Sequence, residues 1–232
     1  MNGLKLTCLL FILPGMLKAA DLKVFTEPRA AITAARTEGK LIVFLLWDSR
    51  DKTHLPVAEK LKVDLNRLND EFVLVNCAHS QKANRDLFSG RFGKELTALP
   101  IAVVSNDAGE AITSTNGTEA IEYDKLLLTA RIEGGKISDP VKLATLKTAL
   151  EKVGEEKGFL TPMVEDLKQE KVAITKMRQW TKTDGSTFDA ILLEALGDHG
   201  VFVDQRGNST KVKFMELSPE DLKLLQSLLR VE

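Results

Sequence analysis

The chain is poor in cysteine, histidine and aromatic residues. Its 232 residues include two cysteines, Cys8 and Cys77, and three histidines, His54, His79 and His199. A disulfide scaffold and a cysteine-based zinc finger both need several regularly spaced cysteines, so both classes are excluded. The histidines lie far apart, which argues against a catalytic zinc site. We therefore expect no metal and no cofactor.

Neither sign of charge dominates the composition. Lysine and arginine together number 32, aspartate and glutamate 33, and the formal net charge is −1. This balance argues against a protein that coats nucleic acid or binds membranes through a polybasic surface. Aromatic residues make up only 6% of the chain, too few to suggest a base-stacking platform. We expect no nucleic-acid partner.

The N-terminus carries a short apolar run. Lys5 precedes the apolar residues 6–13, Pro14-Gly15 interrupts them, and Ala19-Ala20 follows. A basic start, a short apolar stretch, a breaker and small residues are typical of a secretory signal peptide, whereas a membrane-spanning helix needs about 20 apolar residues. We predict a signal peptide over residues 1–20, export to the periplasm or the extracellular space, and no membrane span afterwards. An uncleaved N-terminal anchor is the alternative.

Residues 21–134 alternate between two periodicities. Continuous apolar runs predict strands buried on both faces, and three- and four-residue apolar steps predict helices. The predicted strands cover residues 40–47, 71–77, 99–105 and 111–114, and the predicted helices cover 28–37, 55–68, 84–92 and 119–132. Interleaved helices and strands predict a layered α/β domain with a central sheet and flanking helices.

The rest of the chain changes character twice. Residues 135–176 have amphipathic helical spacing, and Thr161-Pro162 is a typical helix start, so they are predicted to form a helical connector. Residues 177–232 contain short strand patterns and turn dipeptides such as Asp184-Gly185. A capping box at Ser218 opens a closing helix. We predict a small all-β domain with a C-terminal helix.

The order of elements in residues 23–133 resembles the thioredoxin family. In that family the first central strand ends in Trp-Cys-x-x-Cys-Lys; here the matching segment is Trp47-Asp48-Ser49-Arg50-Asp51-Lys52. The family's cis-proline strand is matched by Leu99-Pro100-Ile101, after a helix that ends at Gly93. The resemblance implies a thioredoxin-like α/β sandwich with Pro100 at the cis-proline position. Both redox cysteine positions are aspartates, Asp48 and Asp51.

Aspartate at these two positions removes the chemistry for which the family is known. Thiol–disulfide exchange needs a thiolate to attack sulfur, which a carboxylate cannot replace. The simpler interpretation is that Asp48 caps the following helix with Asp51 as its capping-box partner. The alternative is a metal or hydrolase site formed by Asp48, Asp51 and nearby His54.

Cys77 is the single cysteine left after signal removal. It ends an apolar strand pattern, where a lone cysteine is most often a buried small hydrophobe. The alternative is a free thiol that supports atypical oxidoreductase chemistry, for which Cys77 must be exposed in an electropositive setting.

Residues 177–229 resemble the Sla-type homology domain one, a small SH3-like β-barrel. The resemblance is carried by Arg178-Gln179-Trp180-Thr181 at the start and Leu217-Ser218-Pro219-Glu220-Asp221 at the end. A member of that family binds a short peptide, which makes Trp180 a candidate ligand platform; the alternative is a core tryptophan. Together, the two resemblances predict an exported, non-enzymatic binding or scaffold protein of the cell envelope, with a protein or peptide partner.

Overall fold

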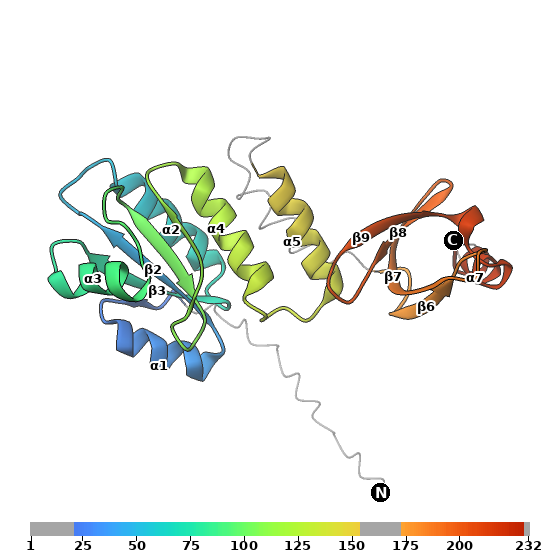
Figure 1. Cartoon of the computed structure of the whole chain (residues 1–232), viewed down its shortest axis with the longest axis horizontal. Helices are drawn as coiled ribbons and strands as arrows, with labels where there is room; N and C mark the ends of the chain where they lie inside the picture. The colour runs from blue at the N-terminus through green and yellow to red at the C-terminus, as the bar shows by residue number, and fades with distance from the viewer. Residues whose placement is uncertain (1–20, 154–172, 230–232) are drawn as a thin grey trace, which may run out of the picture.

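The computed structural model describes residues 21–153 and 173–229, which form two separate sheets with a helix between them (Figure 1). The predicted signal peptide and the predicted helix start at Thr161-Pro162 lie outside the described residues. Within the described ranges, no helix is both long and apolar enough to cross a membrane.

The first sheet has five strands in the order β1-β3-β2-β4-β5. The strands are β1 (Val24–Phe25), β2 (Leu41–Trp47), β3 (Phe72–Ala78), β4 (Ile101–Ser105) and β5 (Ala111–Asn116). Strands β1, β3 and β2 are parallel, whereas β4 is antiparallel to both β2 and β5. This mixed sheet, with its helices in the predicted order, confirms a thioredoxin-like fold.

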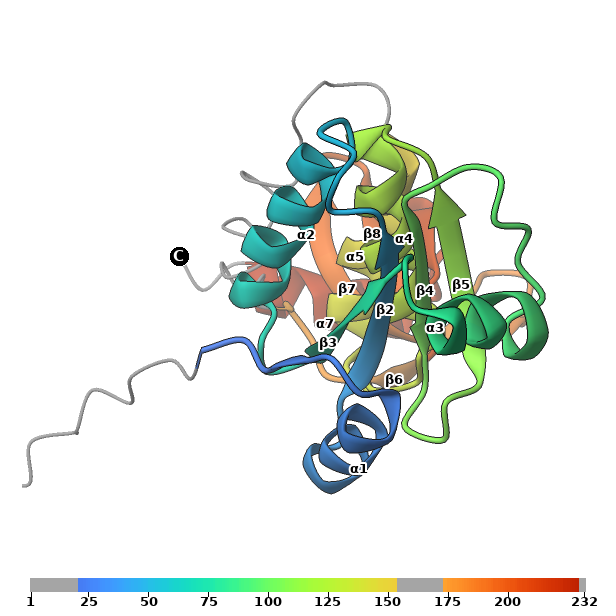
Figure 2. The ribbon, with the colours of Figure 1, turned by 90° about the vertical axis from the view of Figure 1, so that its left-hand side faces the viewer.

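Helices cover both faces of this sheet (Figure 2). The helical segments are α1 (Pro28–Glu38), α2 (Leu55–Arg67), α3 (Lys82–Asp86), the π-helical η1 (Leu87–Arg91) and α4 (Ala120–Glu133). Alternate residues of β2 belong to two different cores: Val43 packs with α2 and α4, and Phe44 packs with α1 and η1. Because both cores are apolar, the central strands read as continuous hydrophobic runs in the sequence.

Helix α5 (Pro140–Lys152) lies within the predicted connector and packs on both parts of the chain. Its Leu146 lies in an apolar cluster with Leu128 of α4, and its Ala144 lies in another with Val203. Lys147 donates hydrogen bonds to the carbonyl of Arg206 at 2.9 Å and to the side-chain oxygen of Asn208 at 2.6 Å.

The second sheet is an antiparallel meander of four strands, β6 (Arg178–Thr181), β7 (Thr187–Leu196), β8 (His199–Val203) and β9 (Ser209–Lys213). After β9 the short helix η2 (Phe214–Glu216) returns the chain to the start of the meander. There the Thr183 N–H donates to the Glu216 carbonyl, and the Ser218 N–H donates to the Thr181 carbonyl, both at 2.8 Å. Helix α7 (Pro219–Leu229) follows, so an all-β sheet with a closing helix is confirmed.

Candidate functional site

The segment that matches the thioredoxin redox motif is a loop of turns that leaves the end of β2. Helix α2 starts at Leu55 with His54 in the N-cap position, and no side chain caps it. The expectation that Asp48 and Asp51 form a capping box on this helix is therefore wrong. Each carboxylate instead accepts hydrogen bonds from a residue two positions later, as is usual for aspartate in turns.

Asp48 is bound by Arg50 through both carboxylate oxygens. Its Oδ1 accepts from the Arg50 backbone N–H and from Nε, each at 3.0 Å, and its Oδ2 accepts from Nη2 at 2.8 Å. These hydrogen bonds from Arg50 hold the pKa of Asp48 far below its usual range. Hydrogen bonds from Thr53 to Asp51 likewise lower the pKa of that carboxyl. Both aspartates are therefore charged near neutral pH and unsuited to act as general acids.

His54 connects the two aspartates. The side chain is buried, its Nδ1 accepts the Asp48 N–H at 3.3 Å, and its Nε2 lies 3.5 Å from Asp51 Oδ2. This contact confirms the prediction, made from their separation in the sequence, that His54 lies close to Asp51. The described part of the chain nevertheless contains no group of three or more His, Cys, Asp or Glu side chains that could hold a metal ion. The metal-site alternative thus has no geometric support at this loop.

The tertiary structure brings Pro100 beside this loop. Leu46 pairs with Ile101 across the sheet, so the cis Leu99-Pro100 bond lies next to the end of β2 at Trp47. The cis-proline assignment is confirmed. The Pro100 carbonyl accepts hydrogen bonds from the Gly117 N–H at 2.8 Å and from the Tyr123 hydroxyl at 3.1 Å.

A cavity of about 170 Å³ lies beside Trp47. It is lined by Thr26, Trp47, Ser49, Asn76, Ala78 and Gln81. The Trp47 indole N–H donates to the Asn76 side-chain oxygen, which orients the ring. Sequence reasoning missed both Asn76 and Tyr123, because their partners lie far away in the chain. The one local signal was a polar Asn76 inside an otherwise apolar strand.

Cys77 lies in the core beneath α1 and η1. Its side chain has no exposed surface, and burial raises the pKa of the thiol to about 12. A reactive cysteine needs the opposite, an exposed site that stabilises the thiolate. The interpretation of Cys77 as a buried small hydrophobe is confirmed, and its thiol is not placed for exchange chemistry.

Trp180 is a core residue, so the hypothesis that it forms a ligand platform is wrong. It has no exposed surface, its indole N–H donates to the Ala190 carbonyl at 3.0 Å, and its ring meets Phe202 edge-on at 5.0 Å between centroids. A tryptophan with both its ring and its N–H satisfied inside the sheet cannot present a face to a ligand.

Side chains and backbone groups of residues 178–181, at the start of the C-terminal sheet, bind residues 218–221 at its end. Arg178 lies 4.6 Å above the Trp180 ring and donates to Asp221 at 2.6 Å. The other Asp221 oxygen accepts the Thr181 N–H at 2.7 Å, and the Asp221 N–H donates to Ser218 Oγ at 3.2 Å. The residues that carry the sequence resemblance here therefore have a structural role.

No family model matches the sequence, and no curated protein matches it. Solved structures similar to the chain include a redox protein from Chlamydomonas reinhardtii, with 18% identity and a TM-score of 0.40 over 49% of this chain and 37% of that one. A thioredoxin from Fasciola hepatica has 16% identity and a TM-score of 0.34, over 45% of this chain and 94% of that one. A DsbH oxidoreductase has 14% identity and a TM-score of 0.38, over 56% and 94%. This chain thus spans just over a third of the Chlamydomonas protein. At such low identities and TM-scores, the thioredoxin-like fold of residues 21–133 rests on the strand order, strand directions and cis-proline register described above.

Proposed function

We propose that this chain is an exported, non-catalytic thioredoxin-like protein that binds a protein or peptide partner. The observation that carries the proposal is the bonding of Asp48 and Asp51, the residues at the positions of the two cysteines in the thioredoxin motif. Asp48 and Asp51 are charged and engaged by Arg50 and Thr53, and the described residues hold a single thiol, Cys77, which is fully buried. Export rests on the signal-peptide pattern of residues 1–20.

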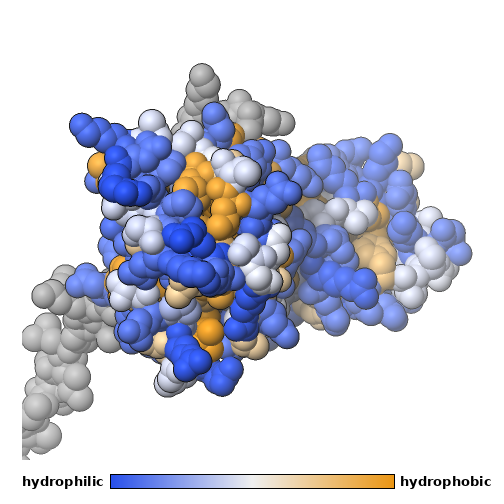
Figure 3. Space-filling model, turned by 60° about the vertical axis from the view of Figure 1, so that its left-hand side comes forward, coloured by the Kyte–Doolittle hydropathy of each residue, from blue (hydrophilic) through white to orange (hydrophobic). Residues whose placement is uncertain are grey.

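The partner surface is the edge that contains the Trp47–Lys52 loop and the cis Leu99-Pro100 bond. Ser49 and Lys52 are exposed there, and Leu99 is half-buried. In Figure 3 the visible surface of the five-stranded domain is mostly hydrophilic, with hydrophobic residues in a few separate areas. Such a surface favours recognition by polar groups around a small apolar contact, as in many transient complexes.

The second part of the proposal is that residues 177–232 form a separate SH3-like interaction domain, carried on the helical connector of residues 135–176. Its support is the sequence resemblance and the return of the chain after η2, where hydrogen bonds from Thr183 and Ser218 join the end of the meander to its first strand. Because Trp180 is buried, a ligand would bind elsewhere on this domain.

Insulin reduction by the full chain tests the absence of redox catalysis, with an active thioredoxin as positive control. We expect no turnover above background, because Cys77, the single thiol among the described residues, is buried. Turnover that disappears in Cys77→Ser would contradict the proposal and support oxidoreductase chemistry at Cys77.

Partner capture from cell-envelope extract tests the binding surface. We expect a Ser49→Glu/Lys52→Glu variant to lose a partner that the wild-type chain retains. Lys223→Glu is the matched control, because Lys223 is an exposed lysine on α7, in the other part of the chain. Equal recovery of every partner by both variants would rule out the Trp47–Lys52 loop as the binding surface.

A further inference from the structure

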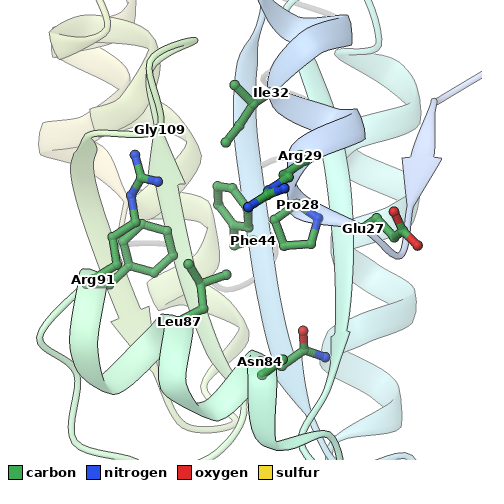
Figure 4. Close-up of a pocket in the computed structure, with 11 residues that line it drawn as sticks. Glu27, Pro28, Arg29, Ile32, Phe44, Asn84, Leu87, Arg91 and Gly109 are labelled. Carbon is green, nitrogen blue, oxygen red and sulfur yellow. The ribbon is translucent and has the colours of Figure 1, made fainter.

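A second cavity lies between α1 and η1, and it shares no lining residue with the cavity beside Trp47. Its volume is about 390 Å³, within the range of small-molecule sites. Ile32 and Leu87 form apolar parts of its two walls, and Phe44 of β2 lies between them (Figure 4).

Two arginines line this apolar cavity from opposite walls, Arg29 from α1 and Arg91 from η1 (Figure 4). Arg29 is exposed, and its guanidinium makes no hydrogen bond or ion pair with a described residue. Arg91 uses one N–H to bind the Ala108 carbonyl at 3.1 Å, which leaves its other donors available. The cavity also has one carboxylate at its edge, Glu27, whose side chain lies on the far side of Pro28 from Arg91 in Figure 4.

The local backbone places the second arginine. Segment η1 is a π-helix closed by a hydrogen bond from the Phe92 N–H to the Leu87 carbonyl at 3.2 Å, and π-helical turns are frequent at functional sites. Gly109 gives the Arg91 guanidinium its space, because a Cβ at Gly109 would lie 2.7 Å from Arg91 Nη2. That same Cβ would lie 3.3 Å from Ile32 Cδ1. Gly109 is therefore close to both the Arg91 guanidinium and the Ile32 side chain.

We propose that this cavity binds a small amphipathic anion, with its carboxylate or phosphate group between Arg29 and Arg91 and its apolar chain over Phe44 and Leu87. Hydrogen bonds from a guanidinium to a carboxylate or phosphate are charge-assisted and are stronger than those between neutral groups. An uncharged apolar molecule would leave both guanidinium groups without an anionic partner. The ligand therefore needs the charge and the chain together.

Calorimetric titration of the full chain with sodium octanoate, octyl phosphate and 1-octanol tests this proposal. We expect at least one of the two anions to bind, and whichever binds more tightly identifies the headgroup. 1-Octanol, which lacks the charge, should bind about tenfold more weakly, since a hydrogen bond to a charged group is worth about 1.5 kcal/mol or more.

Two matched arginine variants locate the site. Arg29→Gln should weaken binding of the anion about tenfold. Arg36→Gln changes an exposed arginine on the same helix that lies outside the cavity, and it should leave affinity unchanged. Thermal melting checks that both variants fold, and amide chemical shifts of Leu87 and Gly109 should move on binding. The proposal is overturned if neither anion binds, if 1-octanol binds equally well, or if the two variants behave alike.

Discussion

Gly207 lies directly against Leu143. A Cβ added at Gly207 would sit 2.4 Å from the Leu143 Cβ and 2.9 Å from the Ala144 nitrogen, so only glycine lets the β8–β9 turn approach α5 this closely. The φ of Gly207 is 73°, in the left-handed region that favours glycine. The contact lies next to the hydrogen bonds of Lys147, and together they attach the C-terminal sheet to α5.

Gly207→Ala should therefore separate the C-terminal sheet from α5 or destabilise the fold. Gly185→Ala is the matched control, because Gly185 also has a positive φ, of 84°, but has no atom within 4 Å of an added Cβ. Both variants carry backbone strain, and only Gly207→Ala adds overlap, which costs about 1–3 kcal/mol. Chemical denaturation of both variants measures the difference. Equal loss of stability would show that the contact with α5 is unimportant.

The ion pair between Glu71 and Arg131 should make stability depend on acidic pH. Arg131 donates two hydrogen bonds of 2.6 Å to Glu71, and Lys142 of α5 adds a third at 3.5 Å. Burial by itself would raise the pKa of Glu71, but Arg131 and Lys142 together outweigh it and the net pKa is lowered from 4.5.

Since the folded pKa of Glu71 is lower than the unfolded one, its stabilisation is complete above about pH 4.5 and is lost as the pH falls through the folded value. Glu71→Gln should cost about 1–3 kcal/mol at pH 7 and flatten the loss of stability at acidic pH. Urea unfolding at several pH values tests this. Glu59→Gln, at an exposed glutamate without an ion pair to any described residue, should leave the pH profile unchanged.

The turn from Asp48 to Asp51 should accept an engineered disulfide. The Asp51 N–H donates to the Asp48 carbonyl at 3.1 Å, which closes a turn. Such a turn brings its end Cα atoms within about 7 Å, near the ~4.4–6.8 Å that a disulfide spans.

The Asp48→Cys/Asp51→Cys variant should therefore form an intramolecular disulfide under mild oxidation and gain some insulin-reducing activity. Peptide mapping by mass spectrometry detects the bond. Asp48→Cys alone is the control, because the buried Cys77 cannot reach a surface thiol. If the double variant keeps both thiols free, the geometry of this loop does not permit a disulfide.

Trp180→Ala should destabilise the C-terminal sheet by about 3–5 kcal/mol, because it removes a fully buried ring. Met215→Ala, at a residue with 77% exposure, should change stability by less than about 0.5 kcal/mol. Thermal melting of both variants tests the assignment of Trp180 to the core. A Trp180→Ala variant as stable as the wild type would contradict the assignment of Trp180 to the core.

Much of the architecture follows from local patterns. Strands β2, β3 and β4 lie within a few residues of the apolar runs that predict them. Helix α1 ends, as predicted, at Gly39, which has a positive φ. These features depend on side-chain periodicity and on the backbone freedom of glycine, both of which are properties of short segments. Aspartate at positions 48 and 51, where the thioredoxin motif has cysteine, is equally visible in the sequence, and the prediction that this motif does not carry out thiol exchange follows from it.

Only the tertiary structure decided the roles of particular side chains. The sequence presents Trp180 and Cys77 as either surface or core, and packing placed both inside. The carboxylates of Asp48 and Asp51 form hydrogen bonds within local turns and do not cap α2. The cavity is lined by both Arg29 and Arg91, which are 62 positions apart in the sequence. Burial and long-range contacts depend on how distant segments meet, which local periodicity does not encode.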